Sequence, residues 1–491
     1  TTLTLGTSGD TVVVPSGVNL APGGGLTLTG ALAVDGGTVK LDGPFPTGTQ
    51  NTALGNDALA SGSLSGGYNT AIGDTALKTN TSGAANVAVG RDALELNTTG
   101  CQNTALGQNV MYTNVSGDFN TAVGREALYS NTTADNNTAL GNSAMKLNTT
   151  GTCNTAVGND ALFSNTTGAQ NTAVGYKALA PNTTGAQNTA VGFGSLCLNI
   201  TGCRNTSMGY NSLAVNTTGI CNVSIGRSTL DANTTGDFNT AVGNSALSGN
   251  TTADNNTAVG HLSLNANTTG TRNTAIGTLA LDANTTADDN TAGGYESLGA
   301  NTTGHSNTAF GKSSLCANTE GVRNTAVGYK ALCTNTTGDD NTAFGTESLR
   351  ANTTGANNVA VGKNALVANT TGDENTAVGC NTLGANTTAD NNTAIGAFAL
   401  DTNTEGHSNV AVGRSALTAN TTADNNTAVG FSALSSNTTG ADNAAFGRRA
   451  LNSNTTAAQN VAIGTCALYT TTTGANNTSV GNYSSKLNTT G

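Results

Sequence analysis

The chain has 491 residues, with 64 glycines, 5 prolines, no tryptophan and only 10% charged residues. So few large side chains exclude several ordinary globular cores, and the scarcity of proline and charge argues against a disordered chain. The net charge of -11 is mild for this length and disfavours nonspecific binding to nucleic acid or to an anionic membrane surface. No apolar run approaches the ~20 residues that cross a bilayer, so we expect no membrane insertion.

Residues 1–50 differ in pattern from the rest of the chain. They contain "TLTLGTSGDTVVVPSGVNL" and "GLTLTGALAVDGGTVKLDG", which are short alternating runs interrupted by glycine and proline. Such runs are typical of short strands joined by turns. We therefore expect residues 1–50 to form a small, irregular β-rich cap or connector.

Residues 51–491 repeat one phrase, N-T-A-V-G-x-x-A-L-x-x-N-T-T-G-x-x. Asn51 and Asn69 begin the first two copies, and each later copy follows after 17 residues until Asn477, which gives 26 starts. If the leading asparagine is position 1, position 5 is glycine in every copy and position 9 is leucine in nearly all. Position 4 is a large apolar residue everywhere except at Gly293. Repetition of this kind indicates one structural unit per copy.

The repeat predicts an all-β fold, a parallel β-solenoid (β-roll) in which each copy is one coil stacked on the previous coil. Seventeen residues cannot hold two helices with their turns, and Gly, Asn and Thr are poor helix formers. We expect strands at T-A-V and A-L-x-x, with the apolar residue of position 4 and the leucine of position 9 pointing inward. The alanines at positions 3 and 8 mark places where another backbone or sheet approaches.

Two residue types are expected to shape the corners of each coil. The position 5 glycines, for example Gly90, Gly124 and Gly464, are predicted turn glycines because glycine adopts positive φ without a steric cost. The asparagines at positions 1 and 12 are expected to stack into amide ladders along the solenoid, as identical stacked residues do elsewhere.

Two resemblances follow from these motifs. The runs N-V-A-V-G at 86–90 and N-V-A-I-G at 460–464 resemble the S-V-A-I-G repeat of YadA-like heads in trimeric autotransporter adhesins. The beginning of the chain and its runs of N-T-A-V-G-x-x-A-L resemble tail-fibre repeat proteins of marine bacteriophages. The first resemblance implies a left-handed β-roll with three chains side by side, and the second implies a trimeric fibre that projects from a virion towards a host receptor.

Catalytic and cofactor chemistry is not indicated by the sequence. Of the three histidines, His305 and His407 share position 16 but lie six coils apart, which is ~29 Å at about 4.8 Å per coil. No histidine pair can converge beside a Ser or Cys nucleophile, so we expect no enzyme activity. The nine cysteines contain no C-x-x-C spacing, so we expect neither a metal site nor a cofactor.

Two pairs of cysteines fall on neighbouring coils, Cys316 with Cys333 and Cys203 with Cys221. A coil spacing of about 4.8 Å lies within the Cα separations that disulfides allow. Both pairs are therefore candidate disulfides. The alternative is that all nine cysteines are free thiols in permissive positions.

Two further surface columns follow from the repeat. Position 6 is aromatic on three successive coils, at Tyr176, Phe193 and Tyr210. Such a ladder either shields a corner of the coil or, if exposed, docks the flat face of a receptor sugar. Acidic residues gather at positions 16 and 17, where we expect solvated corners, with a weak Ca²⁺ stripe as the alternative.

Together these features predict a structural fibre shaft of a phage tail fibre or surface adhesin, which presents receptor-binding surface for host attachment. Its expected partners are copies of itself, in a parallel homotrimer with alanine-lined faces inward, and a glycan or protein receptor on the host surface. The expected location is extracellular, on a virion or a cell surface. The alternatives are a self-assembling extracellular filament and an ice-binding solenoid, because the stacked threonines form regular columns.

Overall fold

The computed structural model describes residues 50–490. Residues 1–49 and 491 lie outside this part, and with them nearly all of the predicted β-rich segment 1–50. The described residues contain strands and turns but no helix, which confirms the all-β prediction.

Each coil contributes one strand of three residues, at positions 2 to 4 of the repeat. The strands are β1 (Thr52–Leu54), β2 (Thr70–Ile72), β3 (Val87–Val89), β4 (Thr104–Leu106), β5 (Thr121–Val123), β6 (Thr138–Leu140), β7 (Thr155–Val157), β8 (Thr172–Val174), β9 (Thr189–Val191), β10 (Thr206–Met208), β11 (Val223–Ile225), β12 (Thr240–Val242), β13 (Thr257–Val259), β14 (Thr274–Ile276), β15 (Thr291–Gly293), β16 (Thr308–Phe310), β17 (Thr325–Val327), β18 (Thr342–Phe344), β19 (Val359–Val361), β20 (Thr376–Val378), β21 (Thr393–Ile395), β22 (Val410–Val412), β23 (Thr427–Val429), β24 (Ala444–Phe446), β25 (Val461–Ile463) and β26 (Thr478–Val480).

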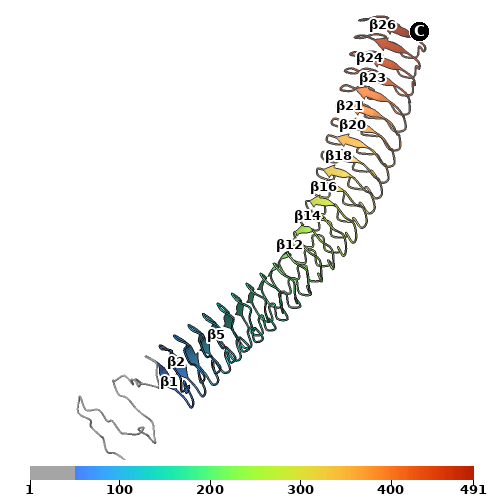
Figure 1. Ribbon diagram of the computed structural model, residues 1–491. Coiled ribbons are helices and arrows are strands. Elements are labelled where there is room, and N and C mark those ends of the chain that lie inside the picture. The colour runs from blue at the N-terminus through green and yellow to red at the C-terminus, as the bar shows by residue number, and fades with distance from the viewer. Residues whose placement is uncertain (1–49, 491) are drawn as a thin grey trace, which may run out of the picture. The chain divides into compact units, whose positions relative to one another are not determined.

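The strands form one parallel sheet in which each strand pairs with the next in chain order (Figure 1). The register is constant, so that Thr121 of β5 lies opposite Thr138 of β6 and Ala122 lies opposite Ala139. Equivalent positions of successive coils therefore stack into columns. This confirms the parallel β-solenoid with one coil per repeat, whereas the left-handed winding stays a prediction.

Backbone groups outside the strands also bond from coil to coil. The N–H of Leu128 donates to the carbonyl of Ala144 at 2.9 Å, and the N–H of Ser130 donates to that of Lys146 at 2.9 Å. In the other direction, the N–H of Gly124 donates to the carbonyl of Leu106 at 2.9 Å. Because each coil bonds to a copy of itself above and below, every coil needs nearly the same residues.

The residue at position 4 points outward, so the prediction that it lies in the core is wrong. In β5 the middle residue Ala122 is fully buried, while Thr121 and Val123 on either side of it are only partly buried. Side chains alternate along a strand, and positions 2 and 4 therefore share the outer face once alanine occupies the inner one. At this point the core of the coil holds only small side chains, alanine in most coils and serine at Ser207 and Ser224.

The second predicted strand, A-L-x-x, is a turn. The residues at positions 7 and 9 have positive φ, 57° at Glu126 and 54° at Leu128, and this left-handed conformation cannot continue a strand. It turns Ala127 and Leu128 into the core, where both are fully buried. The predicted inward orientation of the position 9 leucine is thus confirmed, although the backbone that achieves it differs from the expected one.

The alanine columns belong to the core of a single chain. Ala122 and Ala127 are both 0% exposed, and the equivalent alanines of other coils are buried in the same way. They cannot also line contacts between chains, so the predicted alanine-lined interface is wrong. Any association of chains must use another face of the coil.

The predicted amide ladders are confirmed. At position 12, Nδ2 of Asn131 donates to Oδ1 of Asn114 at 2.7 Å, and Oδ1 of Asn131 accepts from Asn148 at 3.1 Å. At position 1, Oδ1 of Asn103 accepts from the N–H of Asn120 at 2.9 Å. The amides of Asn120 and Asn131 also both donate to the carbonyl of Ala134. These buried amides therefore satisfy one another and fix the corners of each coil.

The position 5 glycines occupy the expected turn. Gly90, Gly124 and Gly464 have φ of 135°, 124° and 130°, a region that other residues rarely adopt. A Cβ added at Gly124 would lie 2.5 Å from the carbonyl oxygen of Gly141 in the next coil. Both the backbone conformation and the close approach of the next coil thus require glycine here.

Candidate functional site

The three aromatic residues at position 6 form a stacked ladder on the surface. The ring centroids are 5.1 Å apart between Tyr176 and Phe193, and 5.3 Å apart between Phe193 and Tyr210. Nζ of Lys177 lies 5.3 Å from the centroid of Tyr176. Both faces of the Phe193 ring are therefore covered by its neighbours, and Tyr176 and Tyr210 each turn one face towards Phe193. This arrangement favours the interpretation that the ladder shields a corner over docking of a sugar on its ring faces.

A groove lies beside this ladder, at position 10 of neighbouring coils. Its volume is about 550 Å³, and most of its lining is apolar, from Phe163, Ala180, Pro181 and Leu198. Lys146 lies over the ring of Phe163, with Nζ 5.9 Å from the centroid. On the next coil, Ala180 is too small to fill the column. The groove thus arises where a small residue follows a large one in the position 10 column.

Four polar residues, Asp160, Ser164, Lys177 and Cys197, complete the lining of the groove. Asp160 and Lys177 carry opposite charges, and the half-buried Cys197 contributes a thiol whose pKa is raised by burial. Lys177 also touches the aromatic ladder, so ladder and groove are adjacent. Sequence reasoning missed the groove, although the change from Phe163 to Ala180 at position 10 was a signal for it.

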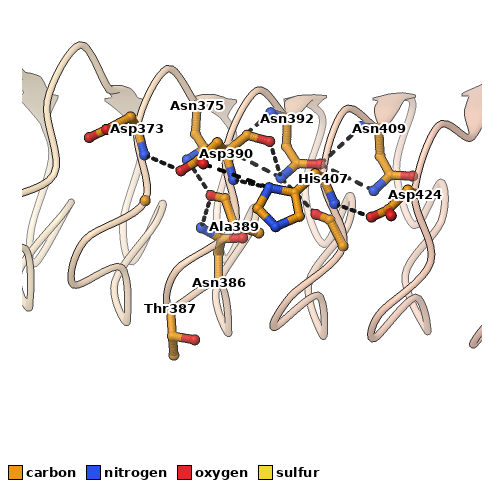
Figure 2. Close-up of polar contacts among 12 residues, drawn as sticks. Asp373, Asn375, Asn386, Thr387, Ala389, Asp390, Asn392, His407, Asn409 and Asp424 are labelled. Atoms are coloured by element: carbon orange, nitrogen blue, oxygen red, sulfur yellow. Dashed lines mark hydrogen bonds and ion pairs between the residues drawn. The ribbon is translucent and has the colours of Figure 1, made fainter.

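The acidic column at position 16 bonds to the backbone (Figure 2). The N–H of Asp373 donates to the carboxylate of Asp390 at 2.8 Å, and the N–H of Asp390 donates to Nδ1 of His407 at 2.9 Å. The N–H of His407 in turn donates to the carboxylate of Asp424 at 2.7 Å. Each of these side chains therefore satisfies a backbone donor of the preceding coil.

Other acids at position 16 make the same contact. They accept from the position 16 N–H of the preceding coil at Asp118, Asp135, Asp237, Asp254, Asp288, Asp339 and Asp373. This bonding explains the acidic column without a cation. Among residues 50–490, no group of three or more His, Cys, Asp and Glu side chains is arranged to hold a metal ion.

The two candidate cysteine pairs differ in geometry, and neither pair is bonded in the structure. The Sγ atoms of Cys316 and Cys333 are 3.0 Å apart. In the other pair, the N–H of Cys221 bonds to the carbonyl of Cys203, but Sγ of Cys203 bonds to the carbonyl of Thr201 and the N–H of Ala186. Both disulfides stay predictions, and the geometry favours the pair of Cys316 and Cys333.

The outer face of the sheet carries an apolar stripe, formed by the position 4 residues of β1 to β26 with the position 2 residues, mostly threonines, beside them. Its large members are well exposed, for example Ile276 at 49%, Phe310 at 47% and Phe344 at 56%. Monomeric proteins rarely expose a continuous apolar surface of this length, which usually marks a site of interaction. We call this surface the outer sheet face.

No helix within the described part of the chain is long and apolar enough to cross a bilayer. Comparisons of the chain with protein-family models and with curated proteins find no match. The resemblances to adhesin heads and tail-fibre repeats therefore stay predictions, and the functional argument rests on the stacked coils, the groove and the outer sheet face.

Proposed function

We propose that this protein is the structural shaft of a phage tail fibre or a related surface adhesin, and that it presents receptor-binding surface for host attachment. The observation that carries this proposal is the contrast between the inside and the outside of the coil. The buried positions 1, 3, 9 and 12 keep nearly the same residue throughout, whereas the partly exposed position 10 holds residues as different as Tyr112, Gly299 and Arg350. A stack of this kind tolerates changes in surface side chains while its scaffold is preserved.

The groove beside Phe163 is the proposed receptor contact. One face of the Phe163 ring is covered by Lys146, and Ala180 leaves space on the side of the next coil. An aromatic or proline surface suits the apolar face of a pyranose ring, while Asp160 and Lys177 can hydrogen-bond to its hydroxyls. We therefore expect a surface polysaccharide of the host cell to bind here.

The outer sheet face is the proposed contact between chains. At about 4.8 Å per coil and roughly 10 Å of width, 26 coils offer on the order of 1,200 Å² per chain. A stable interface needs roughly 800 Å² from each partner, so the face is large enough to hold another copy of the chain. We expect the parallel homotrimer that the resemblances imply. Association would also bring several weak receptor contacts together, which increases avidity.

Filling the groove tests the receptor contact. The Ala180→Phe substitution introduces a side chain that the same column already holds at Phe163, and it should leave the fold intact. We expect the labelled full-length protein to adsorb to susceptible strains in a panel of bacterial cells, measured by flow cytometry. Ala180→Phe should weaken this adsorption at least tenfold, because it occupies the space that a sugar would enter.

The control is Thr418→Phe, which makes the same kind of change at position 10 far along the solenoid. It should adsorb to cells as the unmodified protein does. Adsorption of Ala180→Phe equal to that of Thr418→Phe would show that the groove is not the receptor contact. Absence of adsorption to every strain would count against host attachment.

A further inference from the structure

The sulfur atoms of Cys316 and Cys333 are in contact on the surface of the solenoid. The two cysteines occupy position 10 on successive coils, and the backbone bond from the N–H of Ala317 to the carbonyl of Cys333, 3.0 Å long, holds the coils in register beside them. Their Sγ atoms are 3.0 Å apart, and both residues are only half-buried. The coil spacing of about 4.8 Å lies within the Cα separation that a disulfide requires. A bond between them needs little movement.

A small hollow lies beside Cys316. On the coil before Cys316, position 10 is Gly299, which has no side chain to fill the column. The resulting space is about 290 Å³ and is lined by Asp282, Glu296 and Cys316. This opening lies against Cys316, and Cys333 on the following coil is itself partly exposed.

The charges around the pair are asymmetric. Lys330 and Arg350 favour a negative charge on Cys333, whereas Glu296 opposes ionisation of both thiols. Arg350 also forms an ion pair with Glu347, with 3.1 Å between its nitrogen and the carboxylate oxygen. Lys330 lies over the ring of Tyr329 and has no ion pair with a carboxylate among the described residues. The two cysteines are therefore not equivalent, and Cys333 is the one better placed to be a thiolate.

We propose that Cys316 and Cys333 form a site for thiol–disulfide exchange with small disulfides, in which Cys333 is the attacking thiolate and Cys316 is the resolving thiol. The hydrogen bond with Cys316, together with the smaller effects of Lys330 and Arg350, lowers the pKa of Cys333 to about 7 in spite of its partial burial. The same interaction, together with burial, raises the pKa of Cys316. A thiolate is the form that attacks disulfides, so this division suits the two roles.

The exchange proceeds in two steps. The Cys333 thiolate attacks one sulfur of a disulfide R–S–S–R, which forms a mixed disulfide at Cys333 and releases one thiolate that takes a proton from water. Cys316 then loses its proton to solvent and attacks Sγ of Cys333, which releases the second thiolate. The two cysteines are oxidised to a disulfide, and R–S–S–R is reduced to two thiols. The product links two successive coils covalently.

Glutathione disulfide tests the proposal on the reduced full-length protein at pH 7. We expect peptide mapping by mass spectrometry to find a disulfide between Cys316 and Cys333, with no glutathione retained on either. In Cys316→Ser the reaction should stop at a mixed disulfide on Cys333, because the resolving thiol is missing. In Cys333→Ser the glutathione adduct at Cys316 should form about tenfold more slowly than the adduct at Cys333 forms in Cys316→Ser.

Cys197 is an internal control, because it occupies the same column between Ala180 and Ala214 and has no neighbouring thiol. Burial raises the pKa of Cys197, whereas the pKa of Cys333 is lowered by its hydrogen bond with Cys316 and by Lys330 and Arg350. After allowance for the lower nucleophilicity of the more acidic thiol, iodoacetamide should alkylate Cys333 about tenfold faster than Cys197. Equal alkylation rates, or stable glutathione adducts without a bond between Cys316 and Cys333, would overturn the proposal.

Discussion

Gly124→Val should lower the free energy of local opening around residue 124 by on the order of 4 kcal/mol. The φ of 124° is strained for a β-branched residue, and the new Cβ would lie 2.5 Å from the carbonyl oxygen of Gly141. That carbonyl belongs to the backbone of the next coil and can yield only if the stack separates. Hydrogen exchange of the amides in the coils of β4 to β6 measures the effect, since coils far along the solenoid contact only their own neighbours.

A matched glycine substitution separates the turn requirement from simple crowding. Position 15 is also glycine in most coils, and a Cβ added at Gly151 would likewise meet a carbonyl of the next coil, that of Gly168. Nevertheless Ala134 and Ala253 occupy the same position elsewhere and are buried there. Gly151→Ala should therefore leave local opening nearly unchanged. If the amides near the substitution are as well protected from hydrogen exchange in Gly124→Val as in Gly151→Ala, position 5 does not need glycine.

Asn131→Asp should destabilise the solenoid at pH 7 by about 3 kcal/mol. The amide of Asn131 is fully buried and donates both to Oδ1 of Asn114 and to the carbonyl of Ala134. A carboxylate has no hydrogen to donate, so it would face two oxygen atoms and bury a charge. Hydrogen exchange of the coils that contain Asn114, Asn131 and Asn148 is the measurement.

The defect in Asn131→Asp should depend on pH. Burial beside acceptor oxygens should raise the pKa of the new carboxyl in the folded state above its unfolded value of about 4. The folded state then binds the proton more tightly, so stability should fall as pH rises from the unfolded pKa to the folded pKa and recover below about pH 4. Asn136→Asp is the control, because position 17 is exposed and already holds Asp289 and Asp340. A pH-independent defect in Asn131→Asp would contradict the buried amide ladder.

Much of the coil could be predicted because identical residues stack on one another. The repeat length implied one coil per copy, and the constant Asn, Gly and Leu columns implied ladders, turns and a core. The orientation of position 4 could not be predicted from alternation, since a strand of three residues such as Thr121–Val123 offers two faces. A large apolar residue is usually buried, but in this strand the inner face holds only alanine or serine, as at Ala122 and Ser207.

The turn at positions 7 to 9 could not be predicted from the sequence, for a different reason. Leu128 has a φ of 54°, a conformation that costs roughly 1–2 kcal/mol for a bulky residue and that no local pattern predicts. Burial of its side chain offsets this cost, by about 1.5–3 kcal/mol for a leucine. The groove at Ala180 depends in turn on which side chains lie on the coils above and below. Both features follow from the stack rather than from a single repeat.

The mass of the full-length protein in solution tests the central claim that this solenoid is a shaft assembled through its outer sheet face. Sedimentation equilibrium at micromolar concentration should give about three times the chain mass of 48.3 kDa. The triple variant Ile276→Lys, Phe310→Lys and Phe344→Lys should sediment as a folded monomer, because it places charges on that face. Tyr295→Lys with Tyr329→Lys, which changes exposed aromatics at position 6, should keep the mass of the unmodified protein. A folded monomer of the unmodified chain would contradict the account, as would an assembly that the triple variant leaves intact.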